Sequence, residues 1–311
     1  MAEEVNEILT LEKDALEPLV GLRLDKALSE YDASKTRSHY QKMITEGFVL
    51  VNGKKTKANY KISPSDVITL TPMPIQELSA EPQNIPLDIL YEDEDVIIVN
   101  KPKGMVVHPA PGHPDNTLVN AVMFHCKDRL SSINGVIRPG IVHRIDQDTT
   151  GSLIICKNDA AHNDIAQQIK EHSVNRIYRG IVIGNVKEDE GTIDAPIGRS
   201  EKDRKKMAVH AKHSRNAVTH YKVLQRMKGY TYMEFKLETG RTHQIRVHMA
   251  SIGHPLLGDS VYGPSKCPYH LQGQTLHAMT IGFLHPRNGQ YVEFQAPLPD
   301  YFLHLLDILP R

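Results

Sequence analysis

Residues 140–157, GIVHRIDQDTTGSLIICK, place a histidine, an arginine and two aspartates between a short apolar run and a longer one. We expect Asp146 to lie in a loop, because the apolar residues 140–142 precede it and a strand is expected over residues 152–156. Loops that a rigid scaffold holds in place often carry catalytic groups. A carboxylate in such a loop can bind a metal, cap a helix, form a salt bridge, or act as a nucleophile or base. The residues alone leave all four uses open.

Two other stretches carry side chains suited to the same chemistry. Residues 237–259, LETGRTHQIRVHMASIGHPLLGD, are expected to end a strand, turn at Gly240 and enter a helix near Arg241, where the helix dipole favours anions. The expected buried stripe of this helix is Ile245, Met249 and Ile252. In the other stretch, NRIYRGIVIG, Tyr178 lies in a strand from which its hydroxyl could enter a cleft, although a strand tyrosine is more often a core residue.

The elements that must position these residues follow one another without a regular rhythm. Beyond residue 86, strands are expected over residues 96–99, 153–156, 177–183, 218–224 and 230–238, and helices over residues 117–126 and 159–172. Because helices and strands are interspersed without a βαβ pattern or an internal repeat, we expect an α+β fold. It would be built on a mixed, largely antiparallel sheet with flanking helices.

The first part of the chain shows a different pattern. Residues 22–61 carry nine lysine or arginine residues against four acidic ones, as expected for a surface that faces a polyanion. Two helical runs end at Gly47, and Asn52-Gly53 is a strong hairpin signal. This order is similar to that of the S4 RNA-binding domain. The resemblance implies RNA contacts for Arg23, Lys35, Arg37 and Lys42.

A second basic cluster and several changes of composition complete the organisation of the chain. Residues 201–215 add Lys205 and Lys206 as candidate RNA contacts. The expected divisions are an acidic N-terminal tail (1–17), an S4 domain (18–75), a polar linker that contains proline (76–86) and a catalytic domain (87–311).

The composition excludes several classes of protein. Of the 311 residues, 40% are apolar and 24% charged, as in folded globular chains, and the zero net charge averages over acidic and basic segments. No apolar run reaches the ~18 residues of a membrane span and the N-terminus is acidic, so we expect a cytoplasmic protein. Cys126, Cys156 and Cys267 are too few and too scattered for a disulfide framework or a zinc site, and we predict buried thiols.

Five ordered motifs resemble the RluA type of RNA pseudouridine synthase: HRIDQDTTG, RIYRGIVIG, TGRTHQIRVH, HPLLGDSVYG and LHAMTIGFLHP. The resemblance extends over about residues 21–299 and departs from the family pattern only slightly, for example at Ile145 and Thr150, where leucine and serine are usual. It implies an enzyme that detaches uracil from ribose, rotates it and reattaches it through C5. The implied partner is large-subunit ribosomal RNA or a pre-ribosomal particle, with no cofactor and no metal. We also expect a monomer.

The resemblance implies a role for each chemical group in turn. Asp146 is the expected catalytic aspartate, which either attacks C1′ of the ribose or removes the proton at C2′. A buried carboxylate stays ionised only beside a cation, and the resemblance implies that Arg241 supplies it, with a phosphate contact as the alternative role of that arginine. Tyr178 is expected to stack on the uracil and to help remove the proton from C5.

Other residues are expected to surround the target nucleotide. Arg144 is expected to occupy the stack that the flipped base leaves, with a plain phosphate contact as the alternative, and His143 to shape the loop. Ile245 and Leu276 are expected to line the uracil pocket, with His277 near it. For these three residues, packing in the core is the alternative.

Two other functions fit part of the sequence. A non-catalytic RNA-binding ribosome assembly factor would have the S4 domain, but no reason to retain Asp146, Arg144, Tyr178 and Arg241 together. A glycosidase would need two carboxylates across the scissile bond, and Asp148 is the obvious neighbour of Asp146. The many histidines do not predict a metal site, because those of the TGRTHQIRVH motif are five residues apart and no cysteine pair accompanies them.

Overall fold

The computed structural model describes residues 8–32, 36–72, 80–110, 112–127, 129–133, 138–201, 203 and 206–311. The chain divides into two compact units, Met1–Glu77 and Leu78–Arg311, and each unit has a hydrophobic core of its own. In the described part of the chain, none of the helices has the length and apolarity that a bilayer span requires.

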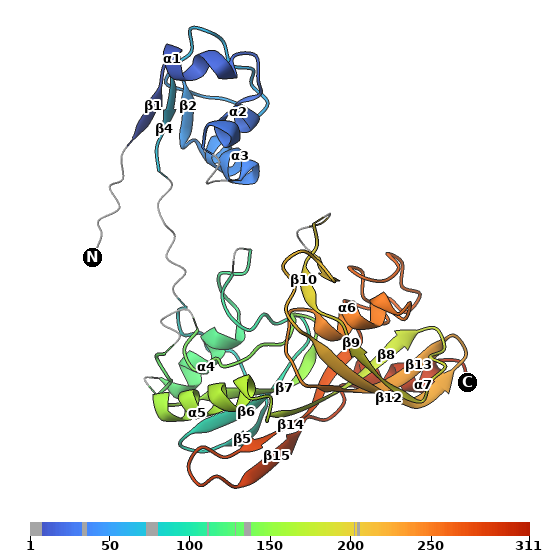
Figure 1. Ribbon diagram of the computed structural model, residues 1–311. Helices are drawn as coiled ribbons and strands as arrows, with labels where there is room; N and C mark the ends of the chain where they lie inside the picture. Colours follow the sequence, from blue (N-terminus) through green and yellow to red (C-terminus); the bar gives the residue numbers. More distant parts are fainter. Residues whose placement is uncertain are drawn as a thin grey trace. The chain divides into compact units, whose positions relative to one another are not determined.

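The first unit packs short helices against a small antiparallel sheet (Figure 1). Its helices are α1 (Lys13–Leu16), the 3₁₀ helix η1 (Glu17–Leu19), α2 (Leu24–Tyr31) and α3 (Arg37–Glu46). Its strands, in spatial order, are β1 (Leu9–Leu11), β4 (Ile68–Leu70), β2 (Val49–Val51) and β3 (Lys54–Lys55). Gly47 ends α3 in a left-handed conformation with φ of 89°, and Asn52 and Gly53 turn the chain from β2 into β3. The predicted helices and hairpin are confirmed.

Two predicted segment boundaries are corrected. Within the predicted tail, residues 1–17, β1 pairs with β4 and Leu11 is buried in the core of the first unit. Within the predicted linker, residues 76–86, Ala80 is buried in the core of the second unit, and residues 76–79 lie outside the described ranges. Apolar side chains anchor parts of both segments, although the overall polarity of these segments suggested none.

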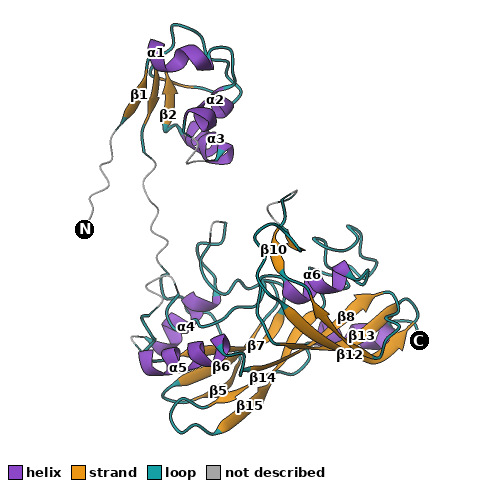
Figure 2. Cartoon of the chain, viewed as in Figure 1, coloured by secondary structure: helices purple, strands orange, loops and turns teal. Residues whose placement is uncertain are grey.

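The second unit is built on one nine-stranded sheet (Figure 2). Its strands, in spatial order, are β5 (Ile89–Glu92), β6 (Val96–Lys101), β7 (Thr150–Cys156), β14 (Leu276–Leu284), β8 (Asn175–Ile183), β13 (Tyr230–Leu237), β12 (Val218–Met227) and β9 (Glu190–Asp194), with β15 (Tyr291–Gln295) also beside β14. The β7–β14 pair is parallel and the other pairs of this sheet are antiparallel. The predicted mixed, largely antiparallel sheet is confirmed. A separate pair is formed by β10 (Ile197–Arg199) and β11 (Met207–Val209).

Helices cover both faces of the large sheet. They are α4 (Leu118–Cys126), α5 (Asp159–Lys170), α6 (Gln244–Ser251) and α7 (Asp300–Ile308). Successive strand residues face opposite sides. On β8, Val182 shares a core cluster with α4 and α6, whereas Ile181 packs with α7. On β6, Ile97 joins the α4 cluster and Ile98 the α5 cluster. Helices α4 and α6 therefore share one face, and α5 and α7 cover the other.

The structure also corrects two details of the sequence prediction. The helix expected near Arg241 begins at Gln244, and Ile252 lies just beyond its end and is 41% exposed, so this residue is not part of the buried stripe. Cys126 and Cys156 are buried as predicted, but Cys267 is only half-buried.

Candidate active site

A cavity of about 750 Å³ opens on the face of the sheet that α6 covers. Its described lining includes seven arginine or lysine side chains: Arg138, Arg144, Lys170, Arg176, Arg215, Arg241 and Arg246. Among the described residues that line it, Asp146 alone carries a carboxyl group. Such a strongly basic cavity favours a polyanionic substrate. Asp148 is not part of the lining, so the carboxylate pair that a glycosidase needs is not formed by these two residues.

Asp146 pairs with an arginine from the first turn of α6. Arg246 Nη1 donates to Asp146 Oδ2 at 3.0 Å. The opposite edge of the guanidinium holds Asp259, with Nε to Oδ2 at 2.7 Å and Nη2 to Oδ1 at 2.9 Å. Burial lowers the pKa of Arg246, but the contacts with Asp259 and Asp146 raise it by more, and the net change is a rise. Arg246 is therefore a fixed cation that contacts Asp146 directly and is itself held by Asp259.

The expectation that Arg241 pairs with Asp146 is wrong. Arg241 lies in the turn before α6, where its backbone N–H donates to Gln244 Oε1 at 2.9 Å and its Nε donates to Asn216 O at 2.9 Å. These bonds direct its side chain toward the β12 side of the cavity. Arg241 still lines the cavity, so the phosphate contact that was its alternative role remains open to it.

A histidine lies near the second carboxylate oxygen of Asp146, and a tyrosine is hydrogen-bonded to that histidine. His243 Nε2 is 3.9 Å from Asp146 Oδ1, and His243 Nδ1 shares a 2.8 Å hydrogen bond with the Tyr262 hydroxyl. That hydroxyl accepts from the Met207 backbone N–H at 2.8 Å, so it can donate its own proton to His243. Burial lowers the pKa of His243, which favours a neutral imidazole beside the carboxylate.

Lys101 holds the loop next to Asp146 through three hydrogen bonds to backbone carbonyls. Lys101 is 1% exposed, and its Nζ donates to Pro102 O and Met105 O at 2.8 Å and to Gln147 O at 2.9 Å. Burial lowers the pKa of Lys101 to about 7. The loop next to Asp146 is thus tied to the turn that follows β6.

Two neighbours on one strand face the cavity from β8. Arg176 and Tyr178 are two residues apart, so their side chains lie on the same side of the strand, and both line the cavity. Tyr178 is 8% exposed, and burial raises the pKa of its hydroxyl. The predicted position of Tyr178 in a cleft agrees with this placement.

The residues on either side of Arg144 are fixed, whereas Arg144 itself is exposed. His143 Nε2 accepts the Ile154 backbone N–H at 3.0 Å, which requires that this nitrogen carries no proton. Burial lowers the pKa of His143 to about 3, in agreement with a neutral ring. His143 therefore accepts the backbone N–H of Ile154 in β7, and this bond holds the loop against that strand.

Two of the three residues expected around the uracil line the cavity. Ile245 and Leu276 are 3% and 4% exposed and line the cavity. His277 follows Leu276 in β14, so it points to the opposite face, and it is not part of the lining. Its Nδ1 bonds Thr150 Oγ1 at 2.8 Å and its Nε2 bonds Ala296 O at 3.1 Å. His277 is a core residue, and its expected place near the uracil pocket is corrected.

In the first unit, a buried aspartate organises two of the predicted RNA-binding arginines. Asp25 Oδ1 accepts from Arg23 Nε at 3.1 Å, and Asp25 Oδ2 accepts from Arg37 Nε at 3.0 Å. The Asp25 side chain is fully buried, whereas each arginine side chain is 46% exposed. Lys42 lies 3.7 Å from Glu46 on the exposed side of α3. Of the other predicted contacts, Lys206 is half-buried, and Lys35 and Lys205 lie outside the described residues.

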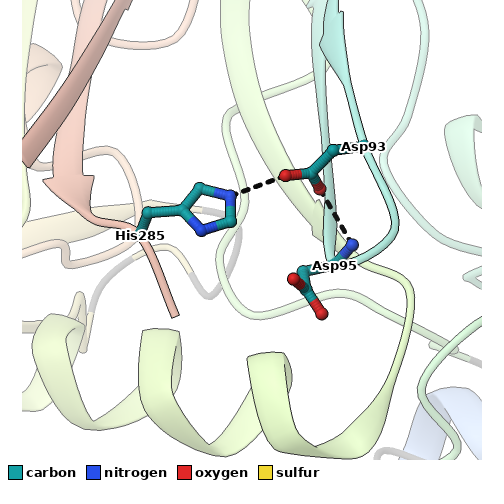
Figure 3. A group of neighbouring side chains, drawn as sticks. All are labelled: Asp93, Asp95 and His285. Atoms are coloured by element: carbon teal, nitrogen blue, oxygen red, sulfur yellow. Dashed lines mark hydrogen bonds and ion pairs between the residues drawn. The ribbon is translucent and has the colours of Figure 1, made fainter. Parts of the chain in front are cut away.

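A second gathering of titratable groups lies away from the cavity and contains Asp93, Asp95 and His285 (Figure 3). Asp93 Oδ1 accepts the backbone N–H groups of Asp95 and Val96 at 2.8 Å, and Asp93 Oδ2 accepts from His285 Nε2 at 2.7 Å. Asp95 Oδ2 accepts from Arg287 Nε at 2.7 Å. Through these hydrogen bonds, His285 and Arg287 connect the segment after β14 to the β5–β6 turn.

The sequence prediction missed Arg246 and Arg176 as candidate site residues. Arg246 lies three residues before Met249, so it falls within the apolar stripe of α6, and an arginine in a buried stripe needs a carboxylate partner. Arg176 lies two residues before Tyr178 and shares its face. The spacing of both arginines could be seen in the sequence. It could not show which distant residue each arginine would contact in the fold.

Comparisons with known proteins agree with this geometry. The sequence profile of the RNA pseudouridylate synthase family matches residues 95–251, and that of the S4 domain matches residues 22–68. The chain is 53% identical to "Uncharacterized RNA pseudouridine synthase YlyB" of Bacillus subtilis, over 93% of this chain and 94% of that one. It is 47% identical to "Ribosomal large subunit pseudouridine synthase D" of Zymomonas mobilis, over 91% of this chain and 92% of that one.

A solved structure supports the fold. Human RNA pseudouridylate synthase domain containing 1 covers 73% of this chain and 97% of its own, with a TM-score of 0.58 and 24% sequence identity. Together with the two profile matches, these similarities establish that the chain belongs to the RNA pseudouridylate synthase family and carries an S4 domain in its first unit.

Proposed function

We propose that this pseudouridine synthase acts on specific uridines of large-subunit ribosomal RNA, with Asp146 as its catalytic residue. The pairing of Asp146 with Arg246 in a strongly basic cavity is the observation that carries the proposal. The relative from Zymomonas mobilis is named for the large ribosomal subunit. An enzyme with this substrate works in the cytoplasm, and we place the protein there. We also propose that it acts as a monomer and without a metal.

The isomerisation breaks the N1–C1′ bond, rotates the uracil and forms a C5–C1′ bond, with loss of the C5 proton and gain of a proton at N1. Arg246 donates to the Asp146 carboxylate at 3.0 Å. The carboxylate then either attacks C1′ or removes the proton at C2′. Because Asp259 and Asp146 grip the guanidinium from both edges, Arg246 also fixes the direction in which Asp146 points.

The other lining residues provide a place for the detached base. Tyr178 lines the cavity, and its ring is the surface on which uracil stacks. Its hydroxyl assists removal of the C5 proton. Ile245 and Leu276 complete the apolar part of the pocket. Arg144 is exposed at the cavity and is the residue that takes the place of the flipped base in the RNA stack.

RNA contacts outside the cavity come from both units. Arg23 and Arg37 present half-exposed guanidinium groups that Asp25 holds in place, and Lys42 lies on the same helix as Arg37. In the second unit, Lys206 contributes positive charge beside the turn between β10 and β11. These cations contact the phosphate backbone and supply affinity rather than sequence specificity.

The test is a map of pseudouridine in large-subunit RNA from cells that lack the protein. We expect loss of specific sites in the deletion and their return with the wild-type chain. Asp146→Asn, which keeps the size of the side chain and removes its charge, is expected not to restore them. Unchanged pseudouridine in the deletion contradicts the substrate assignment, and full rescue by Asp146→Asn contradicts the catalytic assignment.

A further inference from the structure

Arg176 is a buried cation of the cavity wall that the mechanism above does not use. It is 6% exposed and lines the cavity from β8. A buried guanidinium normally has a carboxylate beside it, and among the described residues none pairs with Arg176. Its Nη2 donates to the backbone carbonyl of Glu238 at 2.9 Å, and its Nε is buried and has no hydrogen-bond partner in the described part of the chain.

No described carboxylate pairs with Arg176 to balance its charge. Burial lowers its pKa, nearby Tyr178 raises it, and nearby Arg241 lowers it again. The turn that carries Arg241 also confines the guanidinium, because a Cβ added at Gly240 would lie 2.7 Å from Arg176 Nη1. Two arginines thus lie at one wall of the cavity.

The position of Arg176 along β8 indicates which group of the substrate could bind its guanidinium. Strand residues two apart are separated by ~7 Å, so a nucleotide whose base lies against Tyr178 has its sugar-phosphate backbone within reach of Arg176. A phosphodiester supplies both the negative charge and the hydrogen-bond acceptors that the guanidinium lacks. A neutral base edge would supply acceptors but no charge.

We propose that Arg176, together with Arg241, binds a backbone phosphate adjoining the target uridine and thereby positions the ribose against Asp146. The proposal rests on the proposed function, and it gives Arg241 the phosphate role in place of the carboxylate pairing that the structure assigns to Arg246. Loss of this contact removes a charge-assisted hydrogen bond in a buried site, so the expected loss of rate is about 10- to 100-fold.

The experiment pairs protein variants with chemically altered RNA. A stem-loop in which the wild-type enzyme forms pseudouridine is synthesised with one neutral methylphosphonate at a time in place of each phosphate around the target uridine. Single-turnover rates are then measured for wild type and Arg176→Gln. One methylphosphonate should slow the wild type about 10- to 100-fold and should slow Arg176→Gln by less than about threefold, because the contact is already absent.

Three further variants separate the contact from general damage. Arg176→Lys keeps the charge and should restore part of the sensitivity to that methylphosphonate. Gly240→Ala displaces the guanidinium tip without removing it, and should weaken the same phosphate contact. Arg179→Gln is the matched control: Arg179 lies on the opposite face of β8, pairs with Glu234 at 2.8 Å, and should keep the wild-type pattern.

The outcomes distinguish the two proposals. If wild type and Arg176→Gln lose rate by the same factor at every methylphosphonate, Arg176 acts only on the structure through Glu238 and the phosphate proposal is wrong. If wild type forms no pseudouridine in any large-subunit RNA, the proposed function itself fails. Should Arg176→Gln not fold, Gly240→Ala and Arg176→Lys answer the question with the charge retained.

Discussion

Asp146 and Arg246 are 100 residues apart in the chain, and their side chains meet at 3.0 Å. The same guanidinium binds Asp259 through its other edge, so the position of Asp146 depends on α6 and on the loop that follows it. The carboxylate that we propose as catalytic is therefore oriented by a residue that lies far away in the sequence and that folding brings beside it.

This pairing predicts that Arg246 matters more to the chemical step than Arg241. Arg246→Gln leaves Asp146 and Asp259 without their shared cation, and we expect the single-turnover rate to fall about 10²- to 10³-fold. Arg241→Gln removes one of the two arginines proposed to bind the phosphate, and it should lower the single-turnover rate by no more than about 10- to 100-fold. A larger loss of single-turnover rate in Arg241→Gln than in Arg246→Gln would contradict this assignment.

Tyr178→Phe separates stacking from proton transfer. The ring remains, so RNA affinity should change by less than about threefold. Because burial raises the pKa of the Tyr178 hydroxyl, the phenolate is scarce at neutral pH, and the wild-type rate should increase with pH if the hydroxyl assists removal of the C5 proton. In Tyr178→Phe this increase should disappear. In this variant, RNA with deuterium at C5 should also react more slowly than unlabelled RNA. Identical pH profiles in the two proteins would leave only a packing role for Tyr178.

Gly151 permits the parallel contact between β7 and β14 beside the Asp146 loop. Its φ is 108°, and an added Cβ would lie 2.3 Å from Ala278 O and 2.7 Å from Ala278 N. Gly151→Ala should lower the free energy of unfolding by about 3 kcal/mol or more. Gly229 also has positive φ, 83°, but an added Cβ there meets nothing within 4 Å, so Gly229→Ala should cost only about 1–2 kcal/mol. Thermal unfolding of both variants tests the difference.

Asp25 makes the first unit sensitive to acid. Burial raises its pKa, but hydrogen bonds from Gln41, Arg23 and Arg37 lower it by more, and the pKa falls to about 2. The stabilisation is fully present above about pH 4, the range of an unfolded aspartate, and is lost as pH falls through the folded pKa. Hydrogen exchange of the α2 amides in the full chain should show this loss.

The matched variant for this prediction is Asp25→Asn. It should cost the first unit about 1–3 kcal/mol at neutral pH, because two guanidinium groups lose their shared anchor, and it should remove the acid sensitivity of the α2 amides. RNA affinity should fall with it, since Arg23 and Arg37 are no longer held together. Acid sensitivity that persists in Asp25→Asn would show that another carboxylate is responsible.

Local patterns account for most of the elements. Alternation of apolar residues marked β13, the run of residues 96–99 marked β6, and Asn52-Gly53 marked the β2–β3 turn, because each depends on residues adjacent in the chain. The limits of the first unit were less accurate, since Leu11 is a single apolar residue within an acidic segment and gains its place only by pairing of β1 with β4.

The residue pattern predicted the α+β class, the S4 and synthase motifs, and Asp146 as the candidate catalytic group. The packed fold was needed to show that Arg246, and not Arg241, faces Asp146 and that His277 points away from the cavity. It also showed that Arg176 lies in the cavity wall with no described carboxylate beside it. Motifs show which residue types are present. Ion pairing depends on the directions of side chains from elements that are distant in the chain, and these elements meet only when the sheet and α6 pack.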